Sequence, residues 1–275
     1  MRGSYCSVHT HSRFCDGENT LAEMAQAAFE AGVVSFGASG HCHTPMPEDQ
    51  GCVLPVDMTA YREEVLRLRG EYAGRMDVLL GIELDNCADV TPEGFDYWIG
   101  SVHRLRDSEG NWHMVDWDAQ TLKGCLQSQF TGNSLIMIRS YYDEVCRMAA
   151  RKPTVLGHID LIAKFNEDGY FFDEDDSRYR FAALEALHAA DPGETLLEIN
   201  TGAMSRGYRS VPYPALFLLR EWRDMGGSIL LSADAHRAGD VVYGYVQAAE
   251  LARAAGYERS ALLTHKGREE RALVI

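Results

Sequence analysis

The chain contains 275 residues, of which 46% are hydrophobic and 24% charged, proportions that are typical of a globular protein rather than a disordered one. Its 41 acidic residues against 26 Lys and Arg give a net charge of −15, which argues against a general nucleic-acid-binding protein. No apolar run approaches the ~18 residues of a membrane span, and the first residues do not resemble a signal peptide. The seven Cys residues are odd in number and scattered, so we expect reduced thiols and a cytoplasmic protein.

Short β-type runs alternate with longer helical stretches, which is the pattern of a parallel α/β fold. In chain order we predict strand 5–8, helix 21–31, strand 33–38, helix 58–72, strands 78–83 and 97–102, helix 141–150, strand 155–159, helix 178–190, strand 196–199, helix 213–225, strand 228–232, helix 241–255 and strand 262–265. Thr20 and Glu23 form a candidate capping box at the first helix. Because no Ser- or Pro-rich linker divides these units, the pattern favours one closed barrel over residues 1–275.

Two stretches interrupt the alternation. Residues 104–140 are expected to form a long loop with a partial helix, and long loops in compact domains are often functional, so this loop is a candidate lid. Residues 166–176 contain six acidic and three aromatic residues, and charge runs of this kind predict a solvated loop.

Two histidines, His9 and His11, directly follow the first predicted strand, and Asp16 comes soon after them. Side chains two residues apart in a strand point the same way, so both imidazoles can face one point at the carboxyl end of a barrel strand, where such enzymes keep their active sites. By itself this pair is equally compatible with a metal site and with two ordinary surface histidines.

The pattern gains weight because five later strand ends also supply a His or a carboxylate. Imidazole together with carboxylate suits Zn, Mn or Fe, whereas a Ca or Mg site would consist almost entirely of oxygen. One ion is too few for nine candidate ligands, so we expect two or three divalent ions. The nine candidates are His9, His11, Asp16, His41, Glu83, His103, His158, Asp234 and His236.

The motif order resembles a known family: H-x-H…D-G, then H, G-x-E-x-D, S-V-H, G-H-x-D-L-I, E-I-N-T and S-A-D-A-H. It is similar to the polymerase and histidinol phosphatase (PHP) superfamily, and within it to the monofunctional histidinol-phosphatases. The resemblance extends from Val8 to about Gly244, and residues 156–165 and 198–207 carry most of it. It implies a single PHP domain, folded as a distorted (β/α)7 TIM-like barrel with a trinuclear metal centre at the carboxyl ends of the strands.

The resemblance also implies which residues share each metal. His9, His11, Glu83 and Asp234 would bind the first ion, Glu83 would bridge to a second completed by His103 and His158, and Asp16, His41 and His236 would hold the third. One departure from the family pattern is Gly40. In the family, an acidic residue usually stands directly before the His that corresponds to His41.

The expected reaction is hydrolysis of a phosphate monoester by metal-activated hydroxide, which needs no protein nucleophile. The resemblance implies L-histidinol phosphate as the small-molecule substrate, in histidine biosynthesis. Arg206 and then Lys164 are the candidate phosphate-binding residues, because a cationic side chain complements phosphate oxygens; either is otherwise a surface cation.

His43, Asp85 and Asp160 adjoin proposed ligands and are candidates for the catalytic acid or for orienting a ligand. An alternative function is a PHP-type phosphoesterase acting on another small phosphate ester or on a phosphodiester. Two further alternatives fit the sequence less well. An amidohydrolase-type barrel would have a Lys where Glu83 stands, and a non-catalytic PHP domain would have lost a metal ligand, whereas all nine positions are filled here. No residue pattern indicates an oligomeric state.

Overall fold

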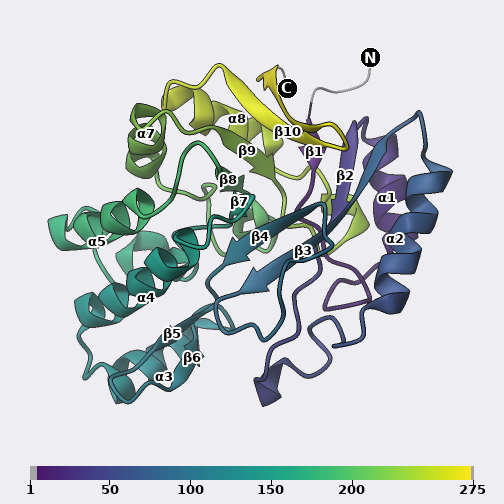
Figure 1. The fold of residues 1–275 in the computed structure, drawn as a ribbon. Coiled ribbons are helices and arrows are strands. Elements are labelled where there is room, and N and C mark those ends of the chain that lie inside the picture. The colour runs from purple at the N-terminus through teal and green to yellow at the C-terminus, as the bar shows by residue number, and fades with distance from the viewer. Residues whose placement is uncertain (1–4, 274–275) are drawn as a thin grey trace.

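A computed structural model describes residues 5–273; residues 1–4 and 274–275, which the predicted domain includes, lie outside the described part. Seven parallel strands form a nearly closed barrel with helices arranged around it (Figure 1). In order of pairing the strands are β1 (Cys6–Ser7), β2 (Ser35–Ala38), β3 (Asp77–Asp85), β4 (Tyr97–Ser101), β7 (Val155–Leu156), β8 (Leu196–Asn200) and β9 (Ile229–Ser232). A parallel bridge between Thr10 and Ala235 brings the chain after β1 beside the chain after β9. The predicted barrel is confirmed.

Helices surround the barrel, and all six predicted helices are present among the eight that the described residues form. Their bounds are α1 (Leu21–Glu30), α2 (Thr59–Glu71), α3 (Ala119–Gln129), α4 (Ser134–Ala149), α5 (Ser177–His188), α6 (Gly202–Ser205), α7 (Leu216–Asp224) and α8 (Tyr245–Ala254). The capping box of α1 is confirmed, since Thr20 Oγ1 accepts from the Glu23 amide at 3.2 Å and Glu23 Oε2 accepts from the Thr20 amide at 2.8 Å. Helix α7 begins later than predicted because Tyr213 pairs with Asn200 instead.

The long loop predicted over residues 104–140 is wrong, although the partial helix predicted with it is present. This stretch forms an antiparallel hairpin of β5 (Arg104–Arg106) and β6 (Trp112–Met114), followed by α3 and the first turns of α4. Asp118 and Asn133 cap the two helices, each accepting from backbone amides of the first turn.

The prediction of a solvated loop over residues 166–176 is also wrong for its central part. Phe171 and Phe172 are buried, and the Asn166 side chain accepts from both of their backbone amides. Glu174 pairs with Arg209, with 2.7 Å between Oε1 and Nη1. The prediction failed because the acidic residues on both sides of Phe171 and Phe172 indicated an exposed loop, whereas the two aromatic side chains pack against the protein.

The last predicted strand exists but does not belong to the barrel. Strand β10 (Arg259–Thr264) pairs antiparallel with β11 (Gly267–Ala272), a strand that the sequence did not predict. Residues 261–263 are buried in one cluster with Cys6, Leu79, Val155 and Leu196, which lie near the starts of their strands. Strand β10 therefore covers the amino end of the barrel (Figure 1).

Tyr97 of β4 belongs to the apolar cluster that fills the amino end of the barrel. Its hydroxyl donates to the Val8 carbonyl at 2.5 Å, so the ring reaches across the interior. A Cβ atom at Gly37 would lie 2.2 Å from the Tyr97 hydroxyl oxygen, and one at Gly81 would lie 2.2 Å from Cζ of the same ring. Both glycines are therefore required for Tyr97 to fit.

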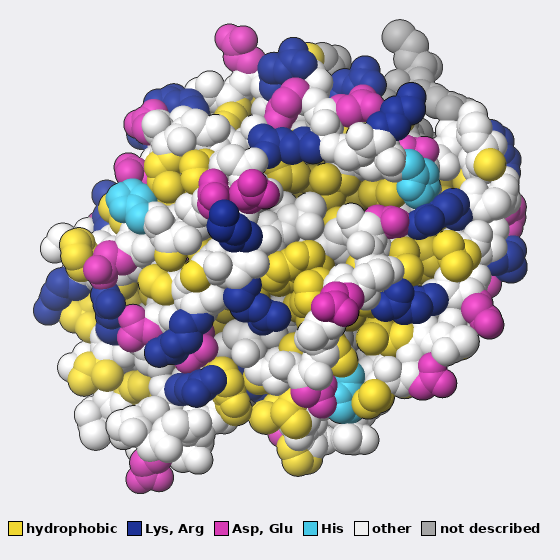
Figure 2. Space-filling model, viewed as in Figure 1, with side chains coloured by type: hydrophobic (Ala, Val, Ile, Leu, Met, Phe, Trp, Pro, Cys, Tyr) yellow, Lys and Arg dark blue, Asp and Glu magenta, His cyan; other side chains and the backbone are white. Residues whose placement is uncertain are grey.

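On the face that Figure 2 shows, Lys and Arg side chains are interspersed with Asp and Glu rather than gathered into one region. Within residues 5–273, no helix is long and apolar enough to cross a membrane.

Candidate metal centre

The nine predicted ligands meet at the carboxyl end of the barrel. His9, His11 and Asp16 follow β1, His41 follows β2, Glu83 lies near the end of β3, His103 follows β4, His158 follows β7, and Asp234 and His236 follow β9. Their nitrogen and oxygen atoms form four overlapping groups, within each of which all the atoms lie within 4.8 Å of one another. The groups are His11, Asp16, His41 and His236; His9, His11 and Asp234; His9, Glu83 and His158; and His41, Glu83 and His103.

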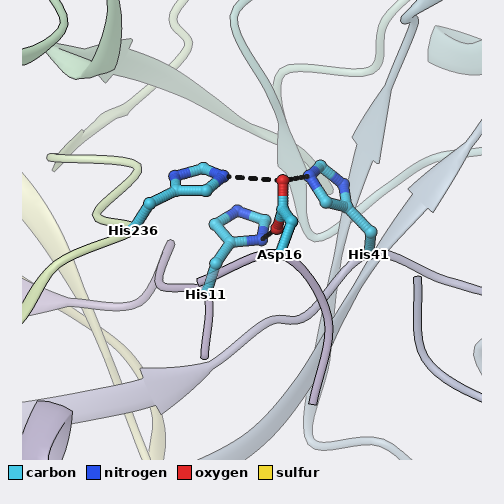
Figure 3. A group of neighbouring side chains, drawn as sticks. All are labelled: His11, Asp16, His41 and His236. Carbon is cyan, nitrogen blue, oxygen red and sulfur yellow. Dashed lines mark ion pairs between the residues drawn. The ribbon is translucent and has the colours of Figure 1, made fainter. Parts of the chain in front are cut away.

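Asp16 stands at the centre of the first group, with imidazoles on several sides (Figure 3). Its Oδ2 lies 3.3 Å from His236 Nε2 and 3.6 Å from His41 Nε2, and its Oδ1 lies 3.6 Å from His11 Nδ1. A cation among these atoms would be met by three imidazoles and one carboxylate.

Glu83 connects the remaining groups. Its Oε1 lies 3.1 Å from His158 Nε2, 3.3 Å from His9 Nε2 and 3.5 Å from His103 Nε2, while its Oε2 lies 2.8 Å from His41 Nδ1. Burial alone would raise the pKa of Glu83, but the charges of His9, His41 and His103 hold this pKa well below its usual range. Glu83 is therefore ionised and has imidazoles at both oxygens, as a bridging ligand requires.

The donor set fits a divalent cation. Buried polar atoms almost always have hydrogen-bond partners, yet His9 Nε2 and His11 Nε2 are buried here without any. Burial, followed by the charges of His236 and His41, lowers the pKa of His11 to about 3, so this imidazole is neutral and has a lone pair to offer. Imidazole and carboxylate in combination suit Zn, Mn or Fe.

Neighbouring polar groups orient several of these rings. Asp85 Oδ2 lies 2.6 Å from His103 Nδ1, so Asp85 holds the side of the ring that faces away from Glu83. Sequence reasoning missed Glu198, which lies 2.5 Å from His9 Nδ1 and is completely buried in β8. The available signal was a charged residue in the middle of a strand that is otherwise apolar around it, Leu197-Glu198-Ile199.

Asp234 has an unusual backbone conformation, with φ of +48°. Such a conformation in a residue other than Gly costs on the order of 1–3 kcal/mol and is commonly found at functional sites. Its Oδ1 lies 3.3 Å from His11 Nε2, and its Oδ2 accepts from Arg206 Nη2 at 3.1 Å. Burial would raise the pKa of Asp234, but the charges of Arg206 and His9 outweigh it and lower this pKa.

A cavity of about 610 Å³ opens over the cluster, and both predicted phosphate-binding residues line it. Lys164 Nζ donates to the backbone carbonyl of Asp116 at 2.8 Å and to its Oδ2 at 3.3 Å. The same ammonium lies over the rings of Phe165 and Tyr208. An ammonium has three N–H groups, so one remains for a ligand.

The three candidate acids have different surroundings. Asp85 lines the cavity, whereas neither His43 nor Asp160 is among the lining residues of the described chain. His43 Nδ1 lies 2.8 Å from Asp89 Oδ1, and Asp160 Oδ2 accepts from the Ala215 amide at 2.8 Å. Burial raises the pKa of Asp160 to about 6.

Gly40, the departure from the family pattern, is closely packed. A Cβ atom there would lie 3.1 Å from Leu54 Cδ2 and 3.3 Å from Cys15 Sγ. The neighbouring Leu54 would have to move before an acidic side chain could enter.

Comparison with known proteins agrees with this geometry. Residues 7–202 match the model of the PHP domain family. The chain belongs to this family. The histidinol-phosphatase of Bacillus subtilis (strain 168) is 26% identical over 260 residues, covering 86% of this chain and 95% of the relative. The "probable histidinol-phosphatase" of Deinococcus radiodurans is 31% identical over 281 residues, covering 91% of this chain and 94% of the relative.

Among solved structures, a histidinol phosphate phosphatase of Lactococcus lactis, complexed with Zn, L-histidinol and phosphate, has the same fold. The TM-score is 0.63 at 18% identity, and the match covers 96% of this chain and 98% of that one.

Proposed function

We propose that this chain is a metal-dependent phosphatase that hydrolyses L-histidinol phosphate to L-histidinol and phosphate in histidine biosynthesis. The observation that carries the proposal is the cluster of nine His, Asp and Glu residues beside a cavity that also contains a Lys and an Arg. Relatives named histidinol-phosphatase that align with 86% or more of the chain support the choice of substrate.

The cluster would hold two or three divalent ions, Zn, Mn or Fe, with Glu83 shared between positions. When bound, such ions lower the pKa of water and neutralise phosphate charge. Asp16 with its surrounding imidazoles would define one position. His103 and His158, whose Nε2 atoms lie 3.5 Å and 3.1 Å from Glu83 Oε1, would contribute to another.

Arg206 and Lys164 would bind the phosphate from the cavity wall. Arg206 lies against Asp234 and 3.0 Å from His236 Nδ1, so its guanidinium adjoins the cluster itself. Asp116 holds Lys164 in place and leaves one N–H for a phosphate oxygen.

Asp85 would act by orienting His103, as its short contact with Nδ1 supports. His43 and Asp160 remain predictions as proton donors. We also infer that the whole chain forms one domain and works in the cytoplasm, on a small molecule rather than on nucleic acid.

The test is phosphate release from L-histidinol phosphate beside p-nitrophenyl phosphate and a nucleotide diester, with and without Zn²⁺ or Mn²⁺. We expect a metal-dependent preference for histidinol phosphate of a hundredfold or more, which corresponds to about 2.7 kcal/mol. Comparable slow turnover of all monoesters, or preference for the diester, would contradict the substrate and favour the broader phosphoesterase alternative.

A further inference from the structure

Glu198 makes four polar contacts although its side chain is completely buried. Its Oε1 lies 2.5 Å from His9 Nδ1 and 2.5 Å from Ser232 Oγ. Its Oε2 accepts from the backbone amide of His158 at 2.8 Å and from Asn200 Nδ2 at 3.0 Å. One carboxylate thus connects the chain after β1 with β9, with the end of β7 and with its own strand, β8.

The contacts require a carboxylate at this position. The His158 amide and the Asn200 NH₂ group can only donate, and they occupy Oε2. At Oε1 the Ser232 hydroxyl donates and His9 must donate as well, since an ionised carboxylate only accepts. Gln would offer an acceptor on one branch only, and its NH₂ group would face a donor.

The same contacts determine which atom His9 presents to the cluster. When His9 is neutral, as a metal ligand must be, its one proton is on Nδ1 and its lone pair is on Nε2, which lies 3.3 Å from Glu83 Oε1 and 3.6 Å from Asp234 Oδ1. The hydrogen bond that the His158 backbone amide donates to Glu198 fixes the backbone of His158. It thereby supports the 3.1 Å approach of His158 Nε2 to Glu83 Oε1.

We propose that Glu198 is a positioning residue shared by two metal positions, the one formed with His9 and Asp234 and the one formed with His9 and His158. The inference rests on the proposed metal centre. It adds that the metal positions of this centre differ in whether they depend on Glu198. None of the four contacts of Glu198 goes to the group of His11, Asp16, His41 and His236. Loss of Glu198 should therefore lower the metal affinity of the two positions that include His9 and leave the affinity of the position around Asp16 unchanged.

The first test measures Zn²⁺ binding to the Glu198→Gln variant. The protein is first freed of metal with a chelator and then titrated with Zn²⁺ in competition with a coloured chelator, which reports the affinity. Partners of metal-binding His residues are typically worth about 10- to 100-fold in metal affinity, and we expect a loss of that size for part of the bound zinc, with the remainder unchanged. The matched control is Glu144→Gln, another buried Glu, which pairs with Arg106 and Arg147 outside the cluster and should bind zinc as the wild type does.

Wild-type affinity at every position in Glu198→Gln would overturn the inference, as would equal weakening of all positions. Failure of the wild type to bind Zn²⁺ would instead overturn the proposed metal centre.

A second measurement does not require that Glu198→Gln folds, because it is made on the wild-type protein. In zinc-loaded wild-type protein, ¹⁵N NMR of the imidazoles reports which nitrogen carries the proton, with His9 assigned by its loss in His9→Asn. We expect a proton on Nδ1 of His9 and none on Nε2. A proton on Nε2 would show that Glu198 does not set the orientation of this ring.

Discussion

The two ends of the barrel are built from opposite kinds of residue. At the amino end, Leu79, Val155, Leu196 and Leu230 are buried in one apolar cluster with Leu262 of β10, which closes that end. At the carboxyl end, the same strands lead into His, Asp and Glu side chains beside an open cavity of about 610 Å³.

A polar layer lies between the two ends. Ser101 donates to Glu83 Oε1 at 2.6 Å, and Ser232 donates to Glu198 at 2.5 Å, so hydroxyl groups separate the apolar cluster from the charged one. Burial of apolar surface stabilises the fold, whereas gathering charged groups opposes it until a ligand compensates them. The amino end should therefore govern stability and the carboxyl end activity, and each should respond separately to substitution.

The largest effect should come from His9→Ala, which removes a group shared by two of the metal positions. Because even the partners of metal-binding residues are worth 10- to 100-fold, we expect phosphatase activity to fall by more than about 100-fold. The folded state should persist by circular dichroism. His188→Ala, on an exposed histidine of α5 bonded to Glu221, is the control and should retain full activity. Equal activity in His9→Ala would remove His9 from the site.

At the opposite end, Leu262→Ala should lower the free energy of unfolding by about 2–5 kcal/mol, as truncation of buried leucines does. Urea unfolding measures this change, and kcat/KM at 25 °C should stay within about twofold because the substitution lies beyond the polar layer. The exposed Val246 gives a matched truncation, Val246→Ala, expected to change stability by less than about 0.5 kcal/mol. A loss of activity in folded Leu262→Ala would show that the two ends are coupled.

Asp160, a buried carboxyl that does not line the cavity, allows a test of pH dependence. Burial raises the pKa of this carboxyl from 3.8 to about 6, so the folded protein binds the proton more tightly than the unfolded chain. The associated stability is fully present below about pH 4 and is lost as the pH rises through 6. Asp160→Asn does not titrate, and its stability relative to the wild type should rise by about 3 kcal/mol across this window. Urea unfolding in chelator at several pH values checks this; a constant difference would contradict it.

The smallest effect concerns substrate binding. Arg206→Ala should raise KM for a phosphorylated substrate by roughly 10- to 150-fold, because a hydrogen bond to a charged group contributes about 1.5–3 kcal/mol. Steady-state kinetics separate this change from kcat. Arg178→Ala, which removes an exposed guanidinium paired with Asp176, controls for loss of charge. An unchanged KM in Arg206→Ala would exclude Arg206 from phosphate binding.

The sequence predicted the barrel and the convergence of nine residues because both depend on local order: short apolar runs followed by His or carboxylates. It did not predict the 104–140 segment, where the strands are three residues long and the polar caps Asp118 and Asn133 resemble loop residues. It also missed the pairing of β10 with β11, since β11 is rich in charge and mostly exposed.

The roles of Glu198 and Asp116 could not be predicted for a different reason. Each acts through a partner that is distant in sequence, His9 for Glu198 and Lys164 for Asp116, and a local pattern does not identify that partner. Motif spacing locates side chains at the strand ends, but the groups that orient them become visible only once the strands are assembled.

The most direct test of the account measures bound metal and phosphate release on the same sample. Wild-type protein would be stripped with a chelator, reloaded stepwise with Zn²⁺ or Mn²⁺, and assayed with L-histidinol phosphate at each step. We predict that activity falls to background in the stripped protein and returns as metal binds, while circular dichroism shows the barrel folded throughout. Full activity in metal-free protein would contradict the assignment of the carboxyl end as a metal-dependent phosphatase site.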